Sequence, residues 1–437
     1  MGFRFGRDKT RAGRYQWISE ALENVVHRQI SDHQREHQAG AGADGRTQGL
    51  RIALLALALT ACPTARTPTA ATFPPVEKAL TQGANWLLSQ QGPDGGWHSN
   101  TYAAFRDGRA LTPVVLSAVL YAAPRDARTA AAYDRGVDFV ASLVDDEGTL
   151  QHRLDYPVYS LAGALLVLDI PRNARHLRQR DAIITLLRAH QLSSENGWSA
   201  EDPEAGGWGY WHEVPVKPPM ATAHHELLSS NLSATLFAVG ALRLSGVPSD
   251  DRSLQTAQAF LLRCRNEDGG FFLTPTNPIQ NKAASDASGR PRSYASATAD
   301  GVRLMLKLGL PITDPKVQAA RAWLLRHVHG AGQHGDFPPE REFSREGSYF
   351  YTSWTVAHAL MFLGVTHLTT PQGAQRWADV FARELMARQQ PDGSFRNAAT
   401  DLREDDPLVA TSLALATLAL ARTAATGDLS TSVTMER

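Results

Sequence analysis

Several charged side chains interrupt segments that are otherwise apolar enough to form buried helices. Asp300 and Arg303 lie one helical turn apart in residues 293–306, and His358 interrupts residues 349–362. A buried carboxylate must be paired or hydrogen bonded, so we expect Asp300 to contact Arg303 or His358 in the interior. Such groups can tie helices together, or Asp300 and His358 can serve as catalytic acid and base.

Aromatic and polar residues gather near the starts of the same apolar segments and in the long connection before one of them. Aromatic faces can hold cations and apolar chains, and they can equally well fill a core. The candidates for lining a cavity are Trp211, His225, Asn231, Tyr294, Arg303, Tyr349, Tyr351 and Trp354.

An acidic run, Arg403-Glu404-Asp405-Asp406, stands directly before the last apolar segment, residues 408–421. A carboxyl group that donates a proton must be kept neutral by burial or by a like-charged neighbour. Beside Arg403, we expect Asp405 and Asp406 to be ionised and to stabilise the N-terminus of the following helix. A catalytic acid at Asp405 or Asp406 is the alternative.

Histidines indicate two candidate metal sites. His224, His225 and Glu226 are consecutive, and a second histidine cluster follows near residue 330. Histidine is the commonest ligand of transition metals, but neither cluster has the ligand spacing of structural zinc. A divalent metal cofactor at His224, His225 and Glu226 is one interpretation, and surface histidines without a metal are the other.

The sequence repeats one pattern six times. Residues 83–97 (GANWLLSQQGPDGGW) align without gaps with residues 381–395 (FARELMARQQPDGSF), and residues 260–271 (FLLRCRNEDGGF) are a third copy. Self-similarity of this kind indicates a repeat architecture. The weaker copies are residues 139–150, residues 323–337 and a segment from Leu186 to Trp198 or Trp208.

Each repeat begins with an amphipathic helix. In the first copy, Leu80, Ala84 and Leu87 share one stripe at helical spacing. An Asp-Gly turn then ends the helix, because glycine adopts the positive φ that stops it. A second helix follows that is apolar almost all round, and such a helix is buried on all sides. These second helices are expected at residues 112–123, 156–168, 229–242, 293–306, 349–362 and 408–421.

One amphipathic and one buried helix per repeat indicate two concentric layers. Six such pairs that close on themselves form an (α/α)6 toroid, an all-α fold with the buried helices inside. An open solenoid would need polar capping repeats, whereas the last repeat here ends in a very apolar helix. We therefore expect one toroidal domain over residues 76–425. Its inner helices would all begin at one rim, where free N–H groups favour an anion or an electron-rich group.

The unit of helix, Gln, Asp-Gly and aromatic residue resembles the QW repeat of squalene cyclases and protein prenyltransferase β-subunits. The resemblance covers residues 77–422 and is clearest at Gln91, Trp97, Gln389 and Phe395. In that superfamily these glutamine and aromatic side chains tie the outer helices together. The resemblance therefore implies a structural role for these four residues.

The resemblance also bears on chemistry. Class II terpene cyclases of this kind place an Asp-x-Asp-Asp acid before an inner helix. Asp405 and Asp406 match its last two positions, but Arg403 replaces the first, and both the repeat and the following Pro407 differ from the pattern. Prenyltransferase β-subunits bind zinc through Asp, Cys and His, whereas Cys264 lies on the core stripe of an outer helix. A degenerate cyclase-like protein is implied, its catalytic activity is left open, and zinc-dependent prenyl transfer is not expected.

The N-terminal region indicates export. Residues 51–62 (RIALLALALTAC) combine a positive charge, an apolar run and small residues before Cys62, and they resemble a bacterial lipobox in which that cysteine is lipidated. Residues 63–75 are expected to be a Pro/Thr/Ala linker, and residues 426–437 a disordered tail. Export signals start near the first residue, so we interpret residues 1–50 as a mis-annotated or disordered extension. A cytoplasmic tail with a chance apolar helix is the alternative.

Composition limits the function. The 437 residues carry 44 Lys plus Arg and 44 Asp plus Glu, which argues against nonspecific nucleic-acid binding. Two cysteines exclude a disulfide framework. We expect a monomeric bacterial lipoprotein, periplasmic or at the cell surface, that contacts a membrane through its lipidated N-terminus. Its barrel would bind or act on an apolar isoprenoid-like molecule. The alternatives are an (α/α)6 carbohydrate-active enzyme and a non-catalytic structural or interaction toroid.

Overall fold

The computed structural model describes residues 74–219 and 225–426. The expectations for the N-terminal extension, the export segment with Cys62, most of the linker, His224 and the tail after Thr426 lie outside the described residues. The repeats lie in one compact unit that begins at Val76. Proline is compatible with the first turn of a helix, so Pro74 and Pro75 begin the first described helix rather than ending the linker.

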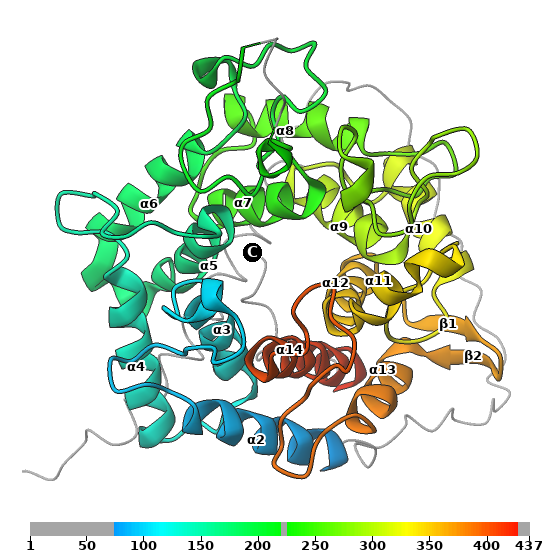
Figure 1. Cartoon of the computed structure of the whole chain (residues 1–437). Coiled ribbons are helices and arrows are strands. Elements are labelled where there is room, and N and C mark those ends of the chain that lie inside the picture. The colour runs from blue at the N-terminus through cyan, green and yellow to red at the C-terminus, as the bar shows by residue number, and fades with distance from the viewer. Residues whose placement is uncertain (1–73, 220–224, 427–437) are drawn as a thin grey trace, which may run out of the picture. The chain divides into compact units, whose positions relative to one another are not determined.

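Six helix pairs form two concentric rings (Figure 1). The outer helices are α2 (Pro74–Ser89), α4 (Ala127–Ala141), α6 (Leu177–Ala189), α8 (Arg252–Arg263), α10 (Pro315–His327) and α13 (Trp377–Met386). The inner helices are α3 (Thr112–Ala122), α5 (Pro157–Leu168), α7 (Leu232–Leu244), α9 (Ala295–Lys307), α12 (Tyr349–Phe362) and α14 (Pro407–Thr426). Each inner helix packs against two other inner helices, and α14 packs against α3, which closes the ring. The all-α (α/α)6 toroid predicted from the repeats is confirmed.

Short elements occupy the connections. A hairpin of β1 (His367–Thr370) and β2 (Gly373–Arg376) joins α12 to α13, with His367 opposite Arg376 in antiparallel register. The repeat pattern did not predict this hairpin. The other short elements are the helix α11 (Glu342–Glu346) and the 3₁₀ helices η2 (Ala103–Phe105), η3 (Pro171–His176), η4 (Ser194–Asn196), η5 (Glu226–Leu228), η6 (Pro278–Gln280) and η7 (Pro339–Arg341).

Hydrophobic patterning accounts for the two layers. In the outer helix α6 the buried residues are Ile183 and Leu187, because its remaining surface faces outward. In the inner helix α5 ten of twelve residues are buried. Among the described residues, one helix, α14, is long and apolar enough to cross a membrane, but 72% of its most apolar stretch is buried inside the protein. This is the pattern of a core helix.

In three of the six repeats a glutamine ties one outer helix to the next. The Nε2 atoms of Gln91 and Gln191 each donate to a backbone carbonyl oxygen, in α4 and α8 respectively, at 2.8 Å. Gln389 Nε2 donates to the carbonyl oxygen of Ala79 in α2 at 2.9 Å. This third hydrogen bond links the last outer helix to the first and closes the outer ring. The structural role implied for these glutamines is confirmed.

The aromatic residue of the repeat connects the turn to the inner helix. The backbone N–H of Trp97 donates to Thr112 Oγ1 of α3 at 2.9 Å. Trp208 does the same with Thr235 of α7 at 3.1 Å. Trp208, and not Trp198, therefore ends the sixth copy of the repeat.

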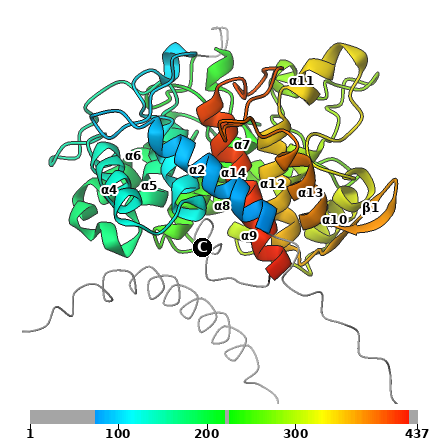
Figure 2. The ribbon, with the colours of Figure 1, turned by 90° about the horizontal axis from the view of Figure 1, so that it is seen from below.

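All six inner helices begin at the same end of the toroid (Figure 2). That end carries the long connections from each outer helix to its inner partner, and we call it the loop rim. The opposite end carries the connections back to the next outer helix, and we call it the base. The loop rim is formed by residues 90–111, 142–156, 190–231, 264–294, 328–348 and 387–406, apart from residues 220–224.

Candidate functional site

Side chains from two helices that are not neighbours meet inside the inner ring. Helices α7 and α12 are separated by α9, yet the hydroxyl oxygens of Ser233 in α7 and Tyr351 in α12 lie 2.7 Å apart. The ring centroids of Phe237 in α7 and Trp354 in α12 lie 5.8 Å apart. Contact past an intervening helix requires these side chains to point toward the axis of the barrel.

A row of aromatic rings leads from the loop rim into the barrel, and we call it the aromatic row. In order of contact it consists of Tyr102, Phe105, Tyr156, Tyr210, Tyr159, Phe237 and Trp354, with successive centroids 5.0 to 6.5 Å apart. Tyr159 and Phe237 are half-buried, although their helices belong to the inner ring. Their direction toward the axis implies that this partly accessible surface faces the barrel.

Arg403 holds the outer end of the aromatic row. Its guanidinium carbon lies 5.0 Å from the ring centroids of Tyr102, Phe105 and Tyr156, and it also donates to the Tyr156 hydroxyl. The backbone of Arg403 has a φ of 60°, a value that residues other than glycine rarely adopt. The cation–π contacts and the hydrogen bond stabilise this unusual backbone at the entrance.

Asp300 of α9 lies beside the aromatic row and receives hydrogen bonds from α12. The hydroxyls of Tyr351 and Thr355 donate to its two carboxylate oxygens at 2.8 Å and 2.5 Å. Arg303 Nη1 lies 3.8 Å from the carboxylate and donates to Thr355 Oγ1 at 2.8 Å. The Arg303 guanidinium also lies 4.3 Å from the Trp354 ring centroid. The expected contact between Asp300 and Arg303 is confirmed.

Burial governs protonation in this cluster. Burial raises the pKa of Asp300 from 3.8 to about 6, although Arg303 and the two hydroxyl donors oppose the shift. Burial, aided by Arg303, lowers the pKa of His358 well below its usual value. The Nδ1 atom of His358 lies 3.2 Å from the Trp354 carbonyl oxygen. At neutral pH the interior therefore contains an ionised Asp300 beside Arg303 and a neutral imidazole.

Glu404 is a buried carboxyl group that the sequence analysis did not select. Its oxygens accept from the backbone N–H groups of Phe350 at 2.9 Å and Tyr351 at 2.7 Å, and from the Asn397 amide at 3.0 Å. Burial raises the pKa of Glu404 to about 7. The carboxyl group fixes the first turn of α12 and thereby positions Tyr351. Its sequence signal was weak, because Glu404 stands in a run of charges that looks like a solvated turn.

Asp405 and Asp406 have structural contacts that agree with the role expected at the N-terminus of the last inner helix. Asp405 accepts from the Tyr102 hydroxyl at 2.5 Å. Burial opposes its ionisation, but the hydrogen bonds from Tyr102 and Thr400 and the charge of Arg396 together outweigh burial and lower the pKa of Asp405. Asp406 accepts from the Ser99 hydroxyl and from the backbone N–H of Leu408 at 2.9 Å, which caps α14.

Two predicted lining residues, Asn231 and Tyr349, make contacts away from the barrel axis. Asn231 is fully buried, and its side-chain oxygen caps α7 by accepting from the backbone N–H of Ala234 at 2.8 Å. Tyr294 is only 1% exposed, and its ring centroid lies 6.1 Å from that of Phe337, so its role as a lining residue stays a prediction. Tyr349 lies against Arg388, whose guanidinium carbon is 3.8 Å from its ring centroid, and Arg388 follows the outer helix α13. A side chain at the start of an inner helix can cap the helix or turn outward, which the sequence pattern did not resolve.

Trp211 and His225 contact each other in the long connection before α7, with centroids 5.1 Å apart. His225 is exposed, and its Nδ1 accepts from the backbone N–H of Leu227 at 3.2 Å. Within the described ranges, no group of three or more potential metal ligands comes together. His224 lies outside those ranges, so the metal site at His224, His225 and Glu226 stays a prediction.

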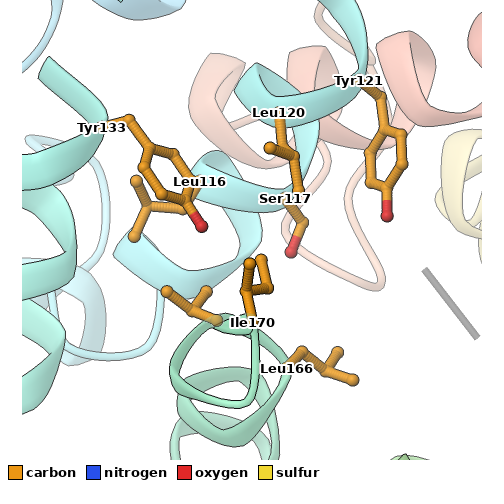
Figure 3. A pocket seen from close by; sticks show the side chains of 8 residues that line it. Leu116, Ser117, Leu120, Tyr121, Tyr133, Leu166 and Ile170 are labelled. Atoms are coloured by element: carbon orange, nitrogen blue, oxygen red, sulfur yellow. The ribbon is translucent and has the colours of Figure 1, made fainter. Parts of the chain in front are cut away.

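A narrow crevice separates the inner helices α3 and α5 (Figure 3). Its volume of about 10 Å³ corresponds to roughly one water molecule. The lining residues are Leu116, Ser117, Leu120, Tyr121, Tyr133, Leu166, Val167 and Ile170. A second hollow, of about 180 Å³, lies at the base beside the ion pair of Glu77 and Arg422. Neither hollow includes a residue of the aromatic row.

No protein-family model matches the chain, and no curated protein sequence matches it. Solved structures do match. A variant of the type II terpene cyclase MstE from Scytonema, in complex with geranylgeranyl dihydroxybenzoate, has a TM-score of 0.52 at 13% identity, over 80% of this chain and 97% of that chain. The apo cyclase has a TM-score of 0.50 at 14% identity, over 80% and 98% of the two chains.

A family 76 glycoside hydrolase from Bacteroides thetaiotaomicron has a TM-score of 0.48 at 11% identity, over 80% of this chain and 77% of that chain. We base no argument on this lower score. The identities to the cyclase structures are low, so these matches show the fold alone. The chain is an α/α toroid with the architecture found in a type II terpene cyclase.

Proposed function

We propose that the protein binds an apolar, isoprenoid-like molecule in its barrel, against the aromatic row. The row itself is the observation that carries the proposal, because it leads from the loop rim to the half-buried Tyr159 and Phe237. Aromatic faces offer a large apolar contact surface, and ligand sites combine such walls with a few polar groups. Complexes of MstE contain geranylgeranyl dihydroxybenzoate and merosterolic acid A, which supports the proposal.

The proposal includes export and attachment to a membrane through a lipidated Cys62. Its support is the sequence of residues 51–62, which combines a positive charge, an apolar run and a lipobox-like end. Attachment would place a monomeric protein beside the membrane, where isoprenoid-like molecules dissolve. Chemical conversion of the bound molecule would depend on the polar side chains in the barrel.

The geometry favours binding of an apolar molecule over hydrolysis of a sugar chain. A glycosidase needs two opposed carboxyl groups about 5 to 10 Å apart, both facing the substrate. Asp300 is 1% exposed and receives hydrogen bonds from Tyr351 and Thr355. Glu404 is fully buried and accepts three hydrogen bonds. Both carboxyl groups are therefore occupied within the protein.

The test is calorimetric titration of the full chain with farnesol and geranylgeraniol. Phe237→Asp places a charge in the aromatic row and should weaken binding at least about tenfold, since a buried unpaired charge is costly. Phe343→Asp is the matched control, because Phe343 is 54% exposed on α11. Binding by wild type and the control but not by Phe237→Asp supports the proposal. No binding of either alcohol, or equal binding by both variants, overturns it.

A further inference from the structure

Side chains of α7, α9 and α12 meet inside the barrel at one level. The Tyr351 hydroxyl of α12 lies 2.7 Å from the Ser233 hydroxyl of α7 and donates to the Asp300 carboxylate of α9 at 2.8 Å. All three helices run from the loop rim toward the base (Figure 2). A residue seven positions later lies on nearly the same helix face and about 10 Å closer to the base. These contacts therefore determine which side chains share a second level, two turns deeper.

The residues seven positions later are Gly240 of α7, Lys307 of α9 and His358 of α12, and we call them the lysine level. A Cβ atom at Gly240 would lie 3.3 Å from Lys307 Cε and 3.5 Å from its Nζ. The Lys307 side chain therefore extends across the face of α7 where glycine leaves it room. His358 belongs to the same level, because one turn before it Trp354 lies against Arg303, which is one turn before Lys307.

The aromatic row leads to the lysine level. Beyond Trp354, ring contacts continue to His358 with centroids 5.0 Å apart, and from His358 to Phe362 with centroids 6.2 Å apart. Lys307 and Phe362 are half-buried, so part of this level is accessible. An apolar chain lying along the aromatic row with one end at the loop rim would bring its inner end toward the amine of Lys307.

The surroundings of Lys307 favour a neutral amine. Burial lowers the pKa of Lys307 from 10.5 to about 7, and the positive charges of Arg303 and Arg243 add to the shift. Arg243 is held beside the end of α9, because its Nε donates to the Lys307 carbonyl oxygen at 3.2 Å. A lysine that is desolvated beside another cation is a nucleophile and can form a Schiff base with a carbonyl compound.

We propose that Lys307 forms an imine with an isoprenoid-like aldehyde that lies along the aromatic row. This inference rests on the proposed function and names a chemical class of its ligand. The Nζ lone pair attacks the aldehyde carbon, the carbonyl oxygen leaves as water with the two amine protons, and a C=N bond replaces the C=O bond. The step needs no oxidant or reductant. An alcohol or a hydrocarbon has no carbonyl carbon and would bind without a covalent bond.

The test uses farnesal as the probe and sodium cyanoborohydride to reduce the imine to a stable secondary amine. The full chain is treated with both at pH 7.5 and digested, and its peptides are analysed by mass spectrometry. Lys78, which is exposed on α2, is the internal control. We expect Lys307 to be modified at least about tenfold more than Lys78, because an ordinary lysine is almost wholly protonated at this pH. The trapped product lacks the carbonyl oxygen, whereas addition of the intact aldehyde would retain it.

Two variants and a competitor test the assignment to Lys307 in the barrel. Lys307→Arg keeps a positive charge but cannot form an imine, so its intact mass should show less than about a tenth of the wild-type label. Lys78→Met is the matched control and should keep the label. Excess farnesol should protect Lys307 in wild type, because both molecules would occupy the same barrel. If Lys307→Arg fails to fold, the mapping and the protection in wild type decide.

The outcomes separate this inference from the proposed function. Equal modification of Lys307 and Lys78, or an unmodified Lys307 in a protein that binds farnesol, overturns the inference and leaves binding of an apolar molecule intact. Modification of Lys307 that excess farnesol does not reduce also overturns it, because the amine would then be reached from outside the occupied barrel. Failure of farnesol to bind in calorimetry contradicts the proposed function itself.

Discussion

Glu404 shows how one side chain can determine the geometry of a site that it does not line. Three N–H groups point at its carboxyl oxygens, two of them from the first turn of α12. Glu404→Ala would leave these donors buried without acceptors, which we expect to cost about 2–4 kcal/mol of unfolding free energy. Urea denaturation followed by circular dichroism measures the change.

The control for Glu404 is Glu346→Ala. Glu346 is exposed on α11, so its removal should change the unfolding free energy by less than about 0.5 kcal/mol. Equal effects of the two substitutions would show that the three hydrogen bonds to Glu404 do not stabilise the start of α12.

Cys264 should be inert while the protein is folded. Its side chain is fully buried, and burial raises the pKa of its thiol well above the usual range. Only the thiolate reacts with alkylating agents at a useful rate. Iodoacetamide should therefore modify Cys264 only after denaturation, as measured by peptide mass spectrometry. Rapid modification of this residue in the native protein would contradict its burial.

The sequence predicted contacts between residues correctly where helical spacing alone places two side chains together. Asp300 and Arg303 are three residues apart in a helix, which places both side chains on one face. Glu404 was missed because its burial depends on the path of residues 387–406 over the start of α12. Tyr349 was misplaced because the direction of a side chain at the start of a helix is set by tertiary contacts.

Gln389 tests the closure of the outer ring at the scale of the helices. Gln389→Ala removes the hydrogen bonds to the carbonyl oxygens of Ala79 and Gly393, both at 2.9 Å. We expect a loss of about 1–3 kcal/mol, because α13 is then no longer tied to α2 through this side chain. Thermal and urea denaturation measure the loss.

The neighbouring Gln390 provides a matched control. It is exposed, and its side-chain amide donates to the carbonyl oxygen of Arg388, two residues earlier, at 3.3 Å. Gln390→Ala should therefore remain within about 0.5 kcal/mol of wild type. A loss as large as that of Gln389→Ala would contradict a special role of the repeat glutamine in ring closure.

The elements that the sequence predicted best are the inner helices. The segment expected at residues 349–362 coincides with α12, and the segment expected at 112–123 ends one residue after α3. These helices are apolar all round, so they can be predicted from the sequence without knowledge of their tertiary contacts. The hairpin of β1 and β2 was missed because its two strands of four residues carry no repeat signal.

Across the whole molecule, the buried carboxyl groups should produce an unusual pH dependence. The pKa of Asp300 is raised from 3.8 to about 6, so the folded state binds this proton more tightly than the unfolded state. Stability contributed by protonated Asp300 is therefore present below about pH 4 and is lost as the pH rises through 6. The charged group facing it is Arg303, and the hydroxyls facing it are those of Tyr351 and Thr355.

The comparison of wild type with Asp300→Asn isolates this contribution. Between pH 4 and pH 7 the unfolding free energy of wild type should fall by about 2–3 kcal/mol relative to the variant, because one pKa unit corresponds to about 1.4 kcal/mol. Other groups, including His358 with its lowered pKa, contribute to both proteins and largely cancel. Parallel pH profiles would show that the pKa of Asp300 is not raised in the folded state.

The fold of the whole chain follows from its six repeats, and the structural similarity to a type II terpene cyclase agrees with it. The ligand does not follow in the same way, since one architecture serves many functions. The aromatic row depends on contacts between helices far apart in sequence, such as Phe237 with Trp354. Such contacts become visible only when the ring is closed.

The most direct test of the central claim is to identify what the protein carries. The full chain is purified under native conditions from the cells that produce it, extracted with organic solvent, and the extract is analysed by mass spectrometry. We predict a stoichiometric isoprenoid-like molecule from wild type and its loss from Phe237→Asp purified in parallel. A clean extract from folded wild-type protein would contradict a binding barrel and would favour a filled, structural toroid.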